Sequence, residues 1–365
     1  MSGIIGDNTG TGSGQIAAVQ GVTKSSSDPA IDTNPSGGVG TIWANTTSGE
    51  MYACKDDTAG ANVWVNVGGG TGDIEPYSFG GTNDGYTHCG AHAPYMDHVD
   101  KFAFASGTQD AVDHGDDTSG RAYVGGNRSA THGYISGGLT TTVSKIQYAS
   151  DATHDAAPAT GTLSWSDRFT CNPGCSSPTH GYVGGWESHT TSIEKITFAT
   201  DAVDARATGL VTAAAYASGS TSEDYGYVAG ANSGSDVIQR YALAAETVST
   251  DVGNIASSTK ASYYRSGASS ADYGYSMGGD SPEINVIERY SFASGSEDAE
   301  NVGDLAVAKG WGMSQSSKTY GYFSGGDYSP QTDDIEKFAF ASSTTDTEAS
   351  GSLTVARMGG VGTEN

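Results

Sequence analysis

The stretch "THGYISGG" (Thr131–Gly138) returns along the chain as "THGYVGGW" (Thr179–Trp186) and "TYGYFSGG" (Thr319–Gly326). Successive copies and variants are 48, 48, 45, 48 and 47 residues apart, measured at the glycine before the tyrosine. A fixed period of about 20 to 50 residues indicates a repeat architecture, in which each repeat buries its apolar face against its neighbours. The sequence therefore predicts six repeats, and their marker glycines are Gly85, Gly133, Gly181, Gly226, Gly274 and Gly321.

Each repeat contains four short segments with strand character. In the last full repeat these are "GWGMSQSS", "YGYFSGG", "DIEKFAFAS" and "TTDTEASGSLTVAR". The first is rich in small residues, which suits the crowded axis of a β-propeller, and the paired glycine of the second suits a tight turn with positive φ. We therefore predict an all-β fold, a six-bladed β-propeller with four strands per blade.

First-type segments occur seven times, one more than six blades need. A propeller commonly closes by pairing strands from both chain ends, which hides edges that would otherwise aggregate. We expect Met358–Thr363 to complete the first blade, with Tyr77–Thr82 lying alongside or acting as a linker. The alternative is a seventh blade, in which residues 41–67 join Met358–Thr363.

Composition divides the chain into three parts. Residues 1–40 are mostly Gly, Ser, Thr, Asp and Asn, which predicts an extended, flexible N-terminal attachment segment. Residues 41–75 contain "GTIWAN", "GEMYAC" and "NVWVNV", which predict a small three-stranded β-meander with Trp43, Tyr52 and Trp64 as its apolar anchors. The propeller is expected over residues 76–365.

The charge balance restricts the partners. The chain has 42 acidic and 17 basic residues, a net charge of −25, which disfavours nucleic acids and anionic membranes. Nothing approaches about 18 consecutive apolar residues, so we expect no membrane insertion. The N-terminal "MSGIIGDNTGTGSGQ" lacks the basic and apolar regions of a secretory signal.

Basic and tyrosine residues recur at fixed repeat positions. The third segments carry Lys101, Lys145, Lys195, Arg240, Arg289 and Lys337. A second basic set opens the first segments: Arg121, Arg168, Arg265, Lys309 and Arg357, with Ala214 or Ala215 in repeat four. Such cations would either ring a channel that holds an anion or make structural contacts between blades. Occupation in every blade favours the structural interpretation, as it does for the repeat tyrosines, Tyr86, Tyr134, Tyr182, Tyr227, Tyr275 and Tyr322.

Few residues suggest chemistry. The cluster "HCGAHAPYMDH" holds His88, Cys89, His92 and His98 without a standard zinc spacing. Cys171 and Cys175 flank a turn and form either a local disulfide or two buried thiols. With 42 acidic residues, paired carboxylates are unavoidable and carry little information. We predict no catalytic residue, no cofactor and no metal.

The repeats also resemble known families. "GYVGG" and the following "IEKF" strand resemble kelch-type β-propellers over residues 76–365, although the kelch tryptophan of the fourth strand is missing. The whole repeat, "IEKFxFAS…TDA…LTVAR…GYxSGG", is similar to propeller proteins of tailed bacteriophages, especially marine ones. "MSGIIG" and "GTIWANTTSGEMYACKDDTAGANVWVNVG" resemble modules near the N-termini of phage tail-fibre and other virion proteins.

This resemblance implies a virion structural protein on the surface of a phage particle. The N-terminal segment would attach to other virion proteins, and the propeller would face a host-surface receptor, glycan or protein, as a tail fibre or receptor-binding protein, in a homo-oligomer. Three alternatives stay open: a head decoration or head-fibre protein of the capsid, a glycan-active propeller enzyme, and a bacterial kelch-like binding protein unrelated to phage.

Overall fold

The computed structural model describes residues 22–68, 70–75, 79–91, 94–149, 157–166, 174–184, 191–206, 208–231, 235–256, 263–294, 298–327, 330–342 and 346–365. Every helix or strand assigned in these ranges is a β-strand, and the strands form seven four-stranded sheets. The chain divides into two compact units, Met1–Tyr77 and Ser78–Asn365. A search of the described residues for a helix long and apolar enough to span a membrane finds none.

The first unit holds one sheet. Its strands are, in order, β1 (Thr23–Ser25), β2 (Ile42–Asn45), β3 (Met51–Asp56) and β4 (Val63–Asn66). Tyr52 and Trp64 are fully buried, and Trp43 meets Trp64 edge-on at 5.8 Å between ring centroids. The three aromatic residues therefore form the expected apolar centre of this module.

The first unit differs from the sequence-based expectation in two respects. The sheet has four strands instead of three, because β1 pairs in parallel with β2. Residues 22–40, expected to be flexible, are ordered against the sheet: the Trp43 indole donates to the Ser27 carbonyl at 2.9 Å, and Asn62 Nδ2 donates to the Ile31 carbonyl at 2.7 Å. Hydrogen bonds from the indole and amide side chains to the backbone hold these residues in place, although they bury little apolar surface. Residues 1–21 lie outside the described residues.

The second unit contains six sheets, each with strands in the order innermost to outermost. The first sheet consists of β28 (Val361–Glu364), β5 (Asp84–Ala91), β6 (Tyr95–Ala103) and β7 (Val112–Asp116). The second consists of β8 (Val124–Arg128), β9 (His132–Gly137), β10 (Thr142–Gln147) and β11 (Ala157–Thr162). The third consists of β12 (Cys175–Ser176), β13 (His180–Gly184), β14 (Ile193–Thr197) and β15 (Ala202–Ala205). The fourth consists of β16 (Ser218–Thr221), β17 (Tyr225–Ala231), β18 (Ser235–Ala242) and β19 (Thr250–Asn254). The fifth consists of β20 (Ser266–Ser269), β21 (Tyr273–Met277), β22 (Val286–Ser291) and β23 (Glu300–Asp304). The sixth consists of β24 (Met313–Ser316), β25 (Tyr320–Ser324), β26 (Asp334–Ala339) and β27 (Glu348–Ser352).

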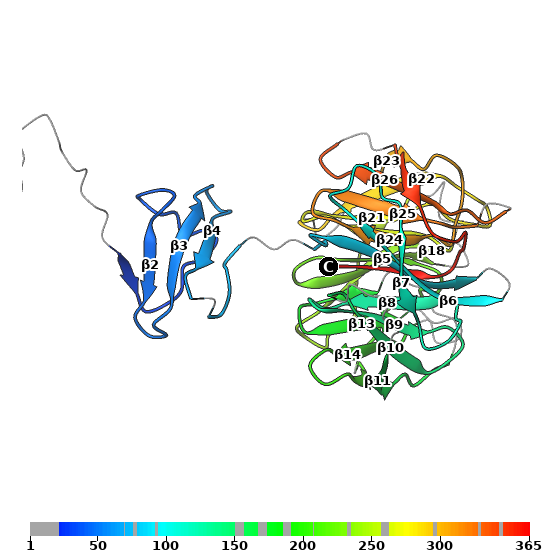
Figure 1. Cartoon of the computed structure of the whole chain (residues 1–365), viewed down its shortest axis with the longest axis horizontal. Helices are drawn as coiled ribbons and strands as arrows, with labels where there is room; N and C mark the ends of the chain where they lie inside the picture. Colours follow the sequence, from blue (N-terminus) through cyan, green and yellow to red (C-terminus); the bar gives the residue numbers. More distant parts are fainter. Residues whose placement is uncertain are drawn as a thin grey trace, which may run out of the picture. The chain divides into compact units, whose positions relative to one another are not determined.

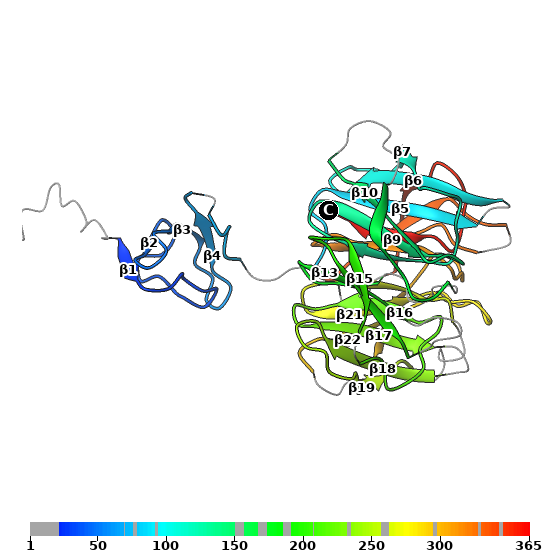
Figure 2. The ribbon, with the colours of Figure 1, turned by 90° about the horizontal axis from the view of Figure 1, so that it is seen from below.

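The innermost strands contact one another in a closed circle. β8 contacts β12, β12 contacts β16, and the series continues through β20 and β24 to β28, which contacts β8. The colours of Figures 1 and 2 accordingly pass round this unit in chain order, and in Figure 1 the red C-terminal strand runs beside the cyan β5. The unit is therefore a β-propeller.

The C-terminal strand closes the ring as the sequence indicated. β28 pairs antiparallel with β5, so it does not join the sheet of the first unit as the seven-blade alternative required. Of the segment Tyr77–Thr82, Gly81 pairs in parallel with Ser317, and its N–H donates to the Ser316 carbonyl at 2.7 Å. Gly81 thus lies alongside the end of β24, and Tyr77 and Ser78 lie outside the described residues.

Glycine occupies the positions where strands or side chains approach most closely. A Cβ on marker Gly321 would stand 2.4 Å from the Phe338 ring on the neighbouring strand of its own sheet. A Cβ on Gly267, in an innermost strand, would stand 1.9 Å from the Gly219 carbonyl oxygen of the adjacent blade. The glycines therefore recur because close packing within and between the sheets requires them, in addition to the turns.

Candidate functional site

The six cations of the third strands each lie beside their own partner. Two of them connect neighbouring sheets: Lys145 Nζ lies 2.5 Å from Asp201 Oδ2, and Lys195 Nζ lies 2.7 Å from Glu246 Oε1. The other four have partners in their own sheet, namely Asp84 for Lys101, the Tyr225 ring for Arg240, Glu300 for Arg289 and Glu348 for Lys337. These side chains do not converge on the axis, which favours the structural interpretation.

The repeat tyrosines connect neighbouring blades. At five of the six junctions the tyrosine lies against the aromatic ring of the residue that directly follows the third strand of the next blade. The pairs and their centroid distances are Tyr86–Tyr148 (4.6 Å), Tyr134–Phe198 (4.9 Å), Tyr227–Phe292 (4.7 Å), Tyr275–Phe340 (5.1 Å) and Tyr322–Phe104 (5.0 Å). Tyr182 is the exception and packs against Leu243. These rings make the tyrosines part of the core.

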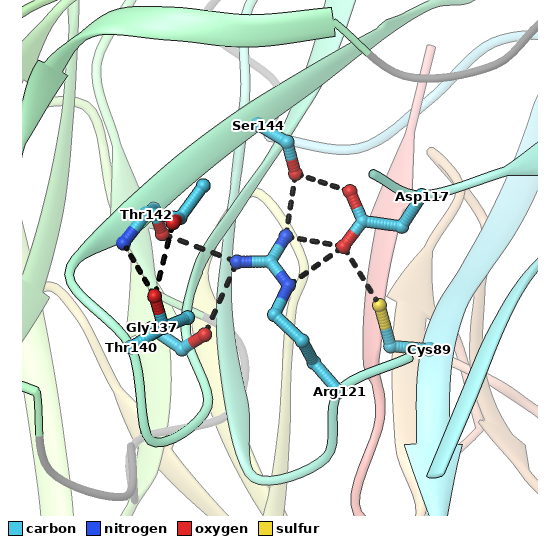
Figure 3. A network of polar contacts seen from close by, with 7 residues as sticks. All are labelled: Cys89, Asp117, Arg121, Gly137, Thr140, Thr142 and Ser144. Carbon is cyan, nitrogen blue, oxygen red and sulfur yellow. Dashed lines mark hydrogen bonds and ion pairs between the residues drawn. The ribbon is translucent and has the colours of Figure 1, made fainter. Parts of the chain in front are cut away.

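The second set of cations forms buried ion pairs. Arg121 donates to Asp117 and to the Gly137 and Thr142 carbonyls, while Asp117 also accepts from Ser144 and Cys89 (Figure 3). The other pairs are Arg265–Glu288 (2.5 Å), Lys309–Glu336 (2.6 Å) and Arg357–Asp100 (3.0 Å). Arg168 lies outside the described residues. Because the described pairs are almost fully buried, they have no route to an external anion.

Each cation of this set that the structure describes meets a buried carboxylate. The residue before the third-strand cation is the acid Asp100, Glu194, Glu288 or Glu336 in four repeats. Repeat four lacks the cation. Counted from Tyr216, Ala214 stands where Arg121, Lys309 and Arg357 stand in their repeats, and Ala217, in place of the expected Ala215, stands where Arg265 does. The acid of repeat four is replaced by Gln239, which exchanges hydrogen bonds with the Thr212 backbone. In repeat two the position is Ser144, and Asp117 supplies the carboxylate instead.

The described residues of the histidine-rich cluster, His88, Cys89 and His98, do not converge on one point; only His98 joins a group of possible metal ligands, with Asp97 and Asp116, whose ligand atoms lie within 4.8 Å of one another. His88 is buried, contacts Thr363 Oγ1 at 2.7 Å and has a pKa lowered to about 3 by burial. The Cys89 thiol donates to Asp117 at 3.2 Å, and His98 lies instead between Asp97 and Asp116. His92 and Cys171 lie outside the described residues, whereas Cys175 is a free, buried thiol.

A collar of strained residues lies where the innermost strands of five blades begin; residues 167–173, before β12, lie outside the described part of the chain. Tyr123, Tyr216, Tyr264 and Trp311 all have φ between 59° and 65°, as does Gly359 at 64°. Their backbones are joined in series: Tyr264 N–H donates to the Tyr216 carbonyl, Trp311 to Tyr264, Gly359 to Trp311 and Tyr123 to Gly359. Positive φ is unusual for bulky residues, and it persists here because the neighbouring blade holds each backbone in place.

The collar also brings aromatic rings together. Tyr264 stacks on Trp311 with ring centroids 3.4 Å apart, while Tyr123 meets Trp311 at 4.9 Å and Tyr216 meets Tyr264 at 4.4 Å. Tyr123, Tyr264 and Trp311 keep part of their surface exposed. Partly exposed rings held by a rigid backbone are suited to stacking against a ligand.

Two carboxylates stand beside the collar. Asp280 Oδ2 accepts from the Trp311 indole at 3.2 Å. Asp327 pairs through its backbone with Gly310, and its pKa is raised by burial and then by the charge of Asp280. The mouth of the ring therefore combines aromatic surface with hydrogen-bond acceptors.

A cleft of about 400 Å³ lies at the opposite end of the inner strands, between the β12–β15 and β16–β19 sheets. It is lined by the β12–β13 and β16–β17 turns and by the chain after β18. Its charged side chains include Lys195, Arg206 and Glu246. Of the sequence-predicted positions, this cleft contains Tyr182 and Lys195.

Comparisons with known proteins support the fold and leave the activity open. No family model matches the chain, and no curated protein matches it. Among 411 similar chains of solved structure, one described as "Structure of YjhT" aligns with a TM-score of 0.53 and 11% identity, over 66% of this chain and 86% of that one. At this identity the likeness shows a β-propeller and nothing about the ligand.

The collar was not foreseen from the sequence. Its residues differ in type, and tyrosine or tryptophan gives no sign of positive φ. The signal that the sequence does offer is position, since Tyr216, Tyr264, Trp311 and Gly359 each stand two residues before an innermost strand.

The collar residues also show that one buried cation comes from a different position. Arg265 follows its collar residue, whereas Arg121, Lys309 and Arg357 stand two residues before theirs. Repeat five therefore supplies the cation of its ion pair from another position.

Proposed function

We propose that this chain is a bacteriophage virion protein that displays its propeller to bind the host surface, as a tail fibre or receptor-binding protein. The resemblance of the repeats and of the N-terminal sequence to phage proteins motivates the proposal. The existence of two separate compact units is compatible with a division between particle attachment and recognition. In this role the chain would be a homo-oligomer on the particle surface.

We further infer that the propeller is a divergent kelch-type ring of six blades. Six of the seven four-stranded sheets belong to the second unit, and their innermost strands contact in a closed cycle. The remaining sheet belongs to the first unit, which would carry the attachment function.

The observation that carries the binding proposal is the aromatic collar. Bulky residues at positive φ cost free energy, of order 1–3 kcal/mol each, and such strain clusters at functional sites. Here it presents Tyr123, Tyr264 and Trp311 at the mouth of the ring. Sugars and protein side chains both offer apolar faces that stack on such rings.

The test uses the full-length chain on cells of the bacterium that the particle infects. Purified protein should compete with particle adsorption, and Tyr123→Ala should weaken cell binding by about tenfold, the scale of one aromatic contact. Tyr320→Ala is the matched control, because Tyr320 is a similarly half-buried tyrosine at the other end of the blades. Absence of the chain from purified particles, or equal binding by both variants, would contradict the proposal.

A capsid location is the nearest variant of this proposal. A head decoration or head-fibre protein would have the same two units and the same resemblance. Imaging of particles labelled with an antibody against the propeller separates the two: label on the tail supports the receptor-binding role, and label on the capsid supports decoration.

A glycan-active enzyme is the second candidate function, and the pair Asp280 and Asp327 favours it. A carboxyl with a raised pKa, such as that of Asp327, can act as a general acid beside a second carboxyl group. The Asp327→Asn variant tests this candidate. If it binds host glycan normally but no longer releases reducing sugar, the protein is an enzyme; if wild type releases none, the binding role stands.

A further inference from the structure

One blade junction breaks the rule that the other five follow. At five junctions the residue directly after the third strand of one blade is aromatic, and its ring covers the repeat tyrosine of the preceding blade at 4.6–5.1 Å. At the junction of the β12–β15 and β16–β19 sheets the covering residue is Leu243. The Tyr182 hydroxyl still donates to the Leu243 carbonyl at 2.5 Å, so the backbone is in place and only the ring at this position is missing. The Tyr241 ring of β18 meets Tyr182 at 5.8 Å, as Tyr290 meets Tyr227 at the next junction.

The cleft of about 400 Å³ opens at this same junction. The preceding junction is filled differently: Asp201 is bonded to both Lys145 and the Tyr134 hydroxyl, and the Phe198 ring stacks on Tyr134. At the cleft, Glu246 pairs with Lys195 and its side chain remains 39% exposed. The space is therefore a local departure from the repeat, and no other described junction replaces the ring.

The walls of the cleft are held in position. Arg206 donates to the Ala242 and Ala245 carbonyls at 2.8 and 2.6 Å, and its guanidinium lies 5.0 Å from the Tyr241 ring. This arginine ties the strand β15 side of the cleft to the chain that follows β18. The cleft is thus preorganised, which reduces the entropic cost of binding a ligand.

The lining favours a neutral, polyhydroxylated ligand. It presents the carboxylates of Glu223, Asp224 and Glu246 together with the cations Lys195 and Arg206, so neither an anion nor a cation is matched by the whole surface. Leu243 adds an apolar contact. A sugar ring has hydroxyls that both donate and accept and a C–H face that packs on apolar groups, and the volume lies near the lower end of small-ligand sites, roughly 300–1,000 Å³.

We propose that this cleft binds one or two residues of a neutral glycan, in the space left by the missing ring. The inference deepens the proposed receptor-binding function and rests on it for its biological purpose. It differs from the collar in place, since the cleft lies where the inner strands end and the collar where they begin.

The test places an aromatic ring at this junction, as at the other five. Leu243→Phe supplies the ring found at the other junctions, so it should keep or raise the Tm while reducing the occupancy of the cleft. The probes are methyl β-galactopyranoside, methyl α-glucopyranoside and methyl β-N-acetylglucosaminide, with glucuronate as the anionic comparison and N-acetyltyrosinamide as the peptide-like one. Saturation-transfer NMR and titration of the full-length wild-type chain should show binding of at least one neutral glycoside, and Leu243→Phe should weaken it at least tenfold.

The matched control is Phe292→Leu, which makes the reverse change where Phe292 covers Tyr227. This variant should lower the Tm and leave glycoside binding unchanged. The proposal is overturned if no neutral glycoside binds, if glucuronate or N-acetyltyrosinamide binds better, or if Leu243→Phe binds like wild type. Loss of binding in Tyr123→Ala but not in Leu243→Phe would assign the sugar to the collar and also overturn it. Because these measurements need no particle or host cell, they remain informative even if the virion role fails.

Discussion

Gln239 shows how this fold treats buried charge at the level of the single residue. Where a blade supplies a buried cation, a carboxylate meets it; where repeat four supplies Ala214 and Ala217, the acid position holds an amide. An unpaired buried charge would cost several kcal/mol, so loss of one partner requires loss of the other. The chain thus contains a neutral version of its own ion pair.

This pairing predicts the behaviour of repeat five. Arg265→Ala should cost about 3–5 kcal/mol, because it leaves Glu288 buried without its counter-charge. The double variant Arg265→Ala/Glu288→Gln reproduces Ala217 and Gln239 of repeat four and should recover most of that loss. Urea unfolding of both proteins measures the difference. A double variant no more stable than the single one would show that the pair is not the source of the loss.

Glu364 gives a second prediction, on pH. Burial raises the pKa of Glu364 to about 7 from 4.5, against the opposing effect of Arg128. The folded state then binds more protons than the unfolded state between these values, so this group lowers the free energy of unfolding as pH rises from 4.5 to 7. The slope cannot exceed about 1.4 kcal/mol per pH unit. Glu364→Gln should remove this contribution.

The measurement is the difference in unfolding free energy between Glu364→Gln and wild type at several pH values. The difference is needed because His88, with its pKa lowered to about 3 by burial, acts in the opposite direction: its contribution is present above pH 6.5 and is lost as pH falls. The advantage of the variant should grow from pH 4.5 to 7 and then level off. A difference independent of pH would mean that Glu364 is ionised throughout.

At the level of elements, β28 is the strand that closes the ring. It pairs with β5 on one side and contacts the innermost strands β24 and β8 of both neighbouring blades. A Cβ on Gly362 would lie 1.9 Å from the Ser314 carbonyl oxygen, so Gly362→Ala forces β24 and β28 apart. We expect a loss of at least 1–3 kcal/mol, the usual cost of overpacking.

Gly107→Ala is the control for this substitution, because a Cβ there meets nothing within 4 Å. It should change stability by no more than about 0.5 kcal/mol. Thermal unfolding of the two variants in parallel provides the comparison. Equal Tm values would show that the inner strands can separate without cost and that closure does not depend on this contact.

The elements also show what the sequence could predict. The marker glycines lie on the second strand of each sheet, and Met358–Thr363 overlaps the closing strand, because glycine spacing and strand alternation reflect local packing. The strand β1 and the order of residues 22–40 were not predicted, since they depend on hydrogen bonds such as Asn62 to Ile31, across 31 residues of chain. Low apolar content alone did not distinguish these residues from a flexible segment.

The candidate sites were harder to predict because they too depend on contacts between residues that lie far apart in the sequence. Asp117 replaces the missing acid at Ser144 from a loop that no alignment of repeats pairs with it. The collar depends on backbone conformations imposed by neighbouring blades, as in the bond from Trp311 to Tyr264. Leu243, by contrast, was visible as the one aliphatic residue at an aromatic position, but its meaning requires knowledge of what that position covers.

At the level of the whole molecule, the two units should fold independently. The first has its own core around Tyr52 and Trp64, and the second closes its ring with strands from its own two ends. A chain that begins at Ser78 should therefore be soluble and unfold cooperatively, with a Tm equal to that of the corresponding transition in the full-length protein. Under the proposed function it should also fail to join the particle. If this chain is unfolded, the first unit contributes to the propeller; if it still assembles, the docking surface lies on the propeller and the division of labour between the units is wrong.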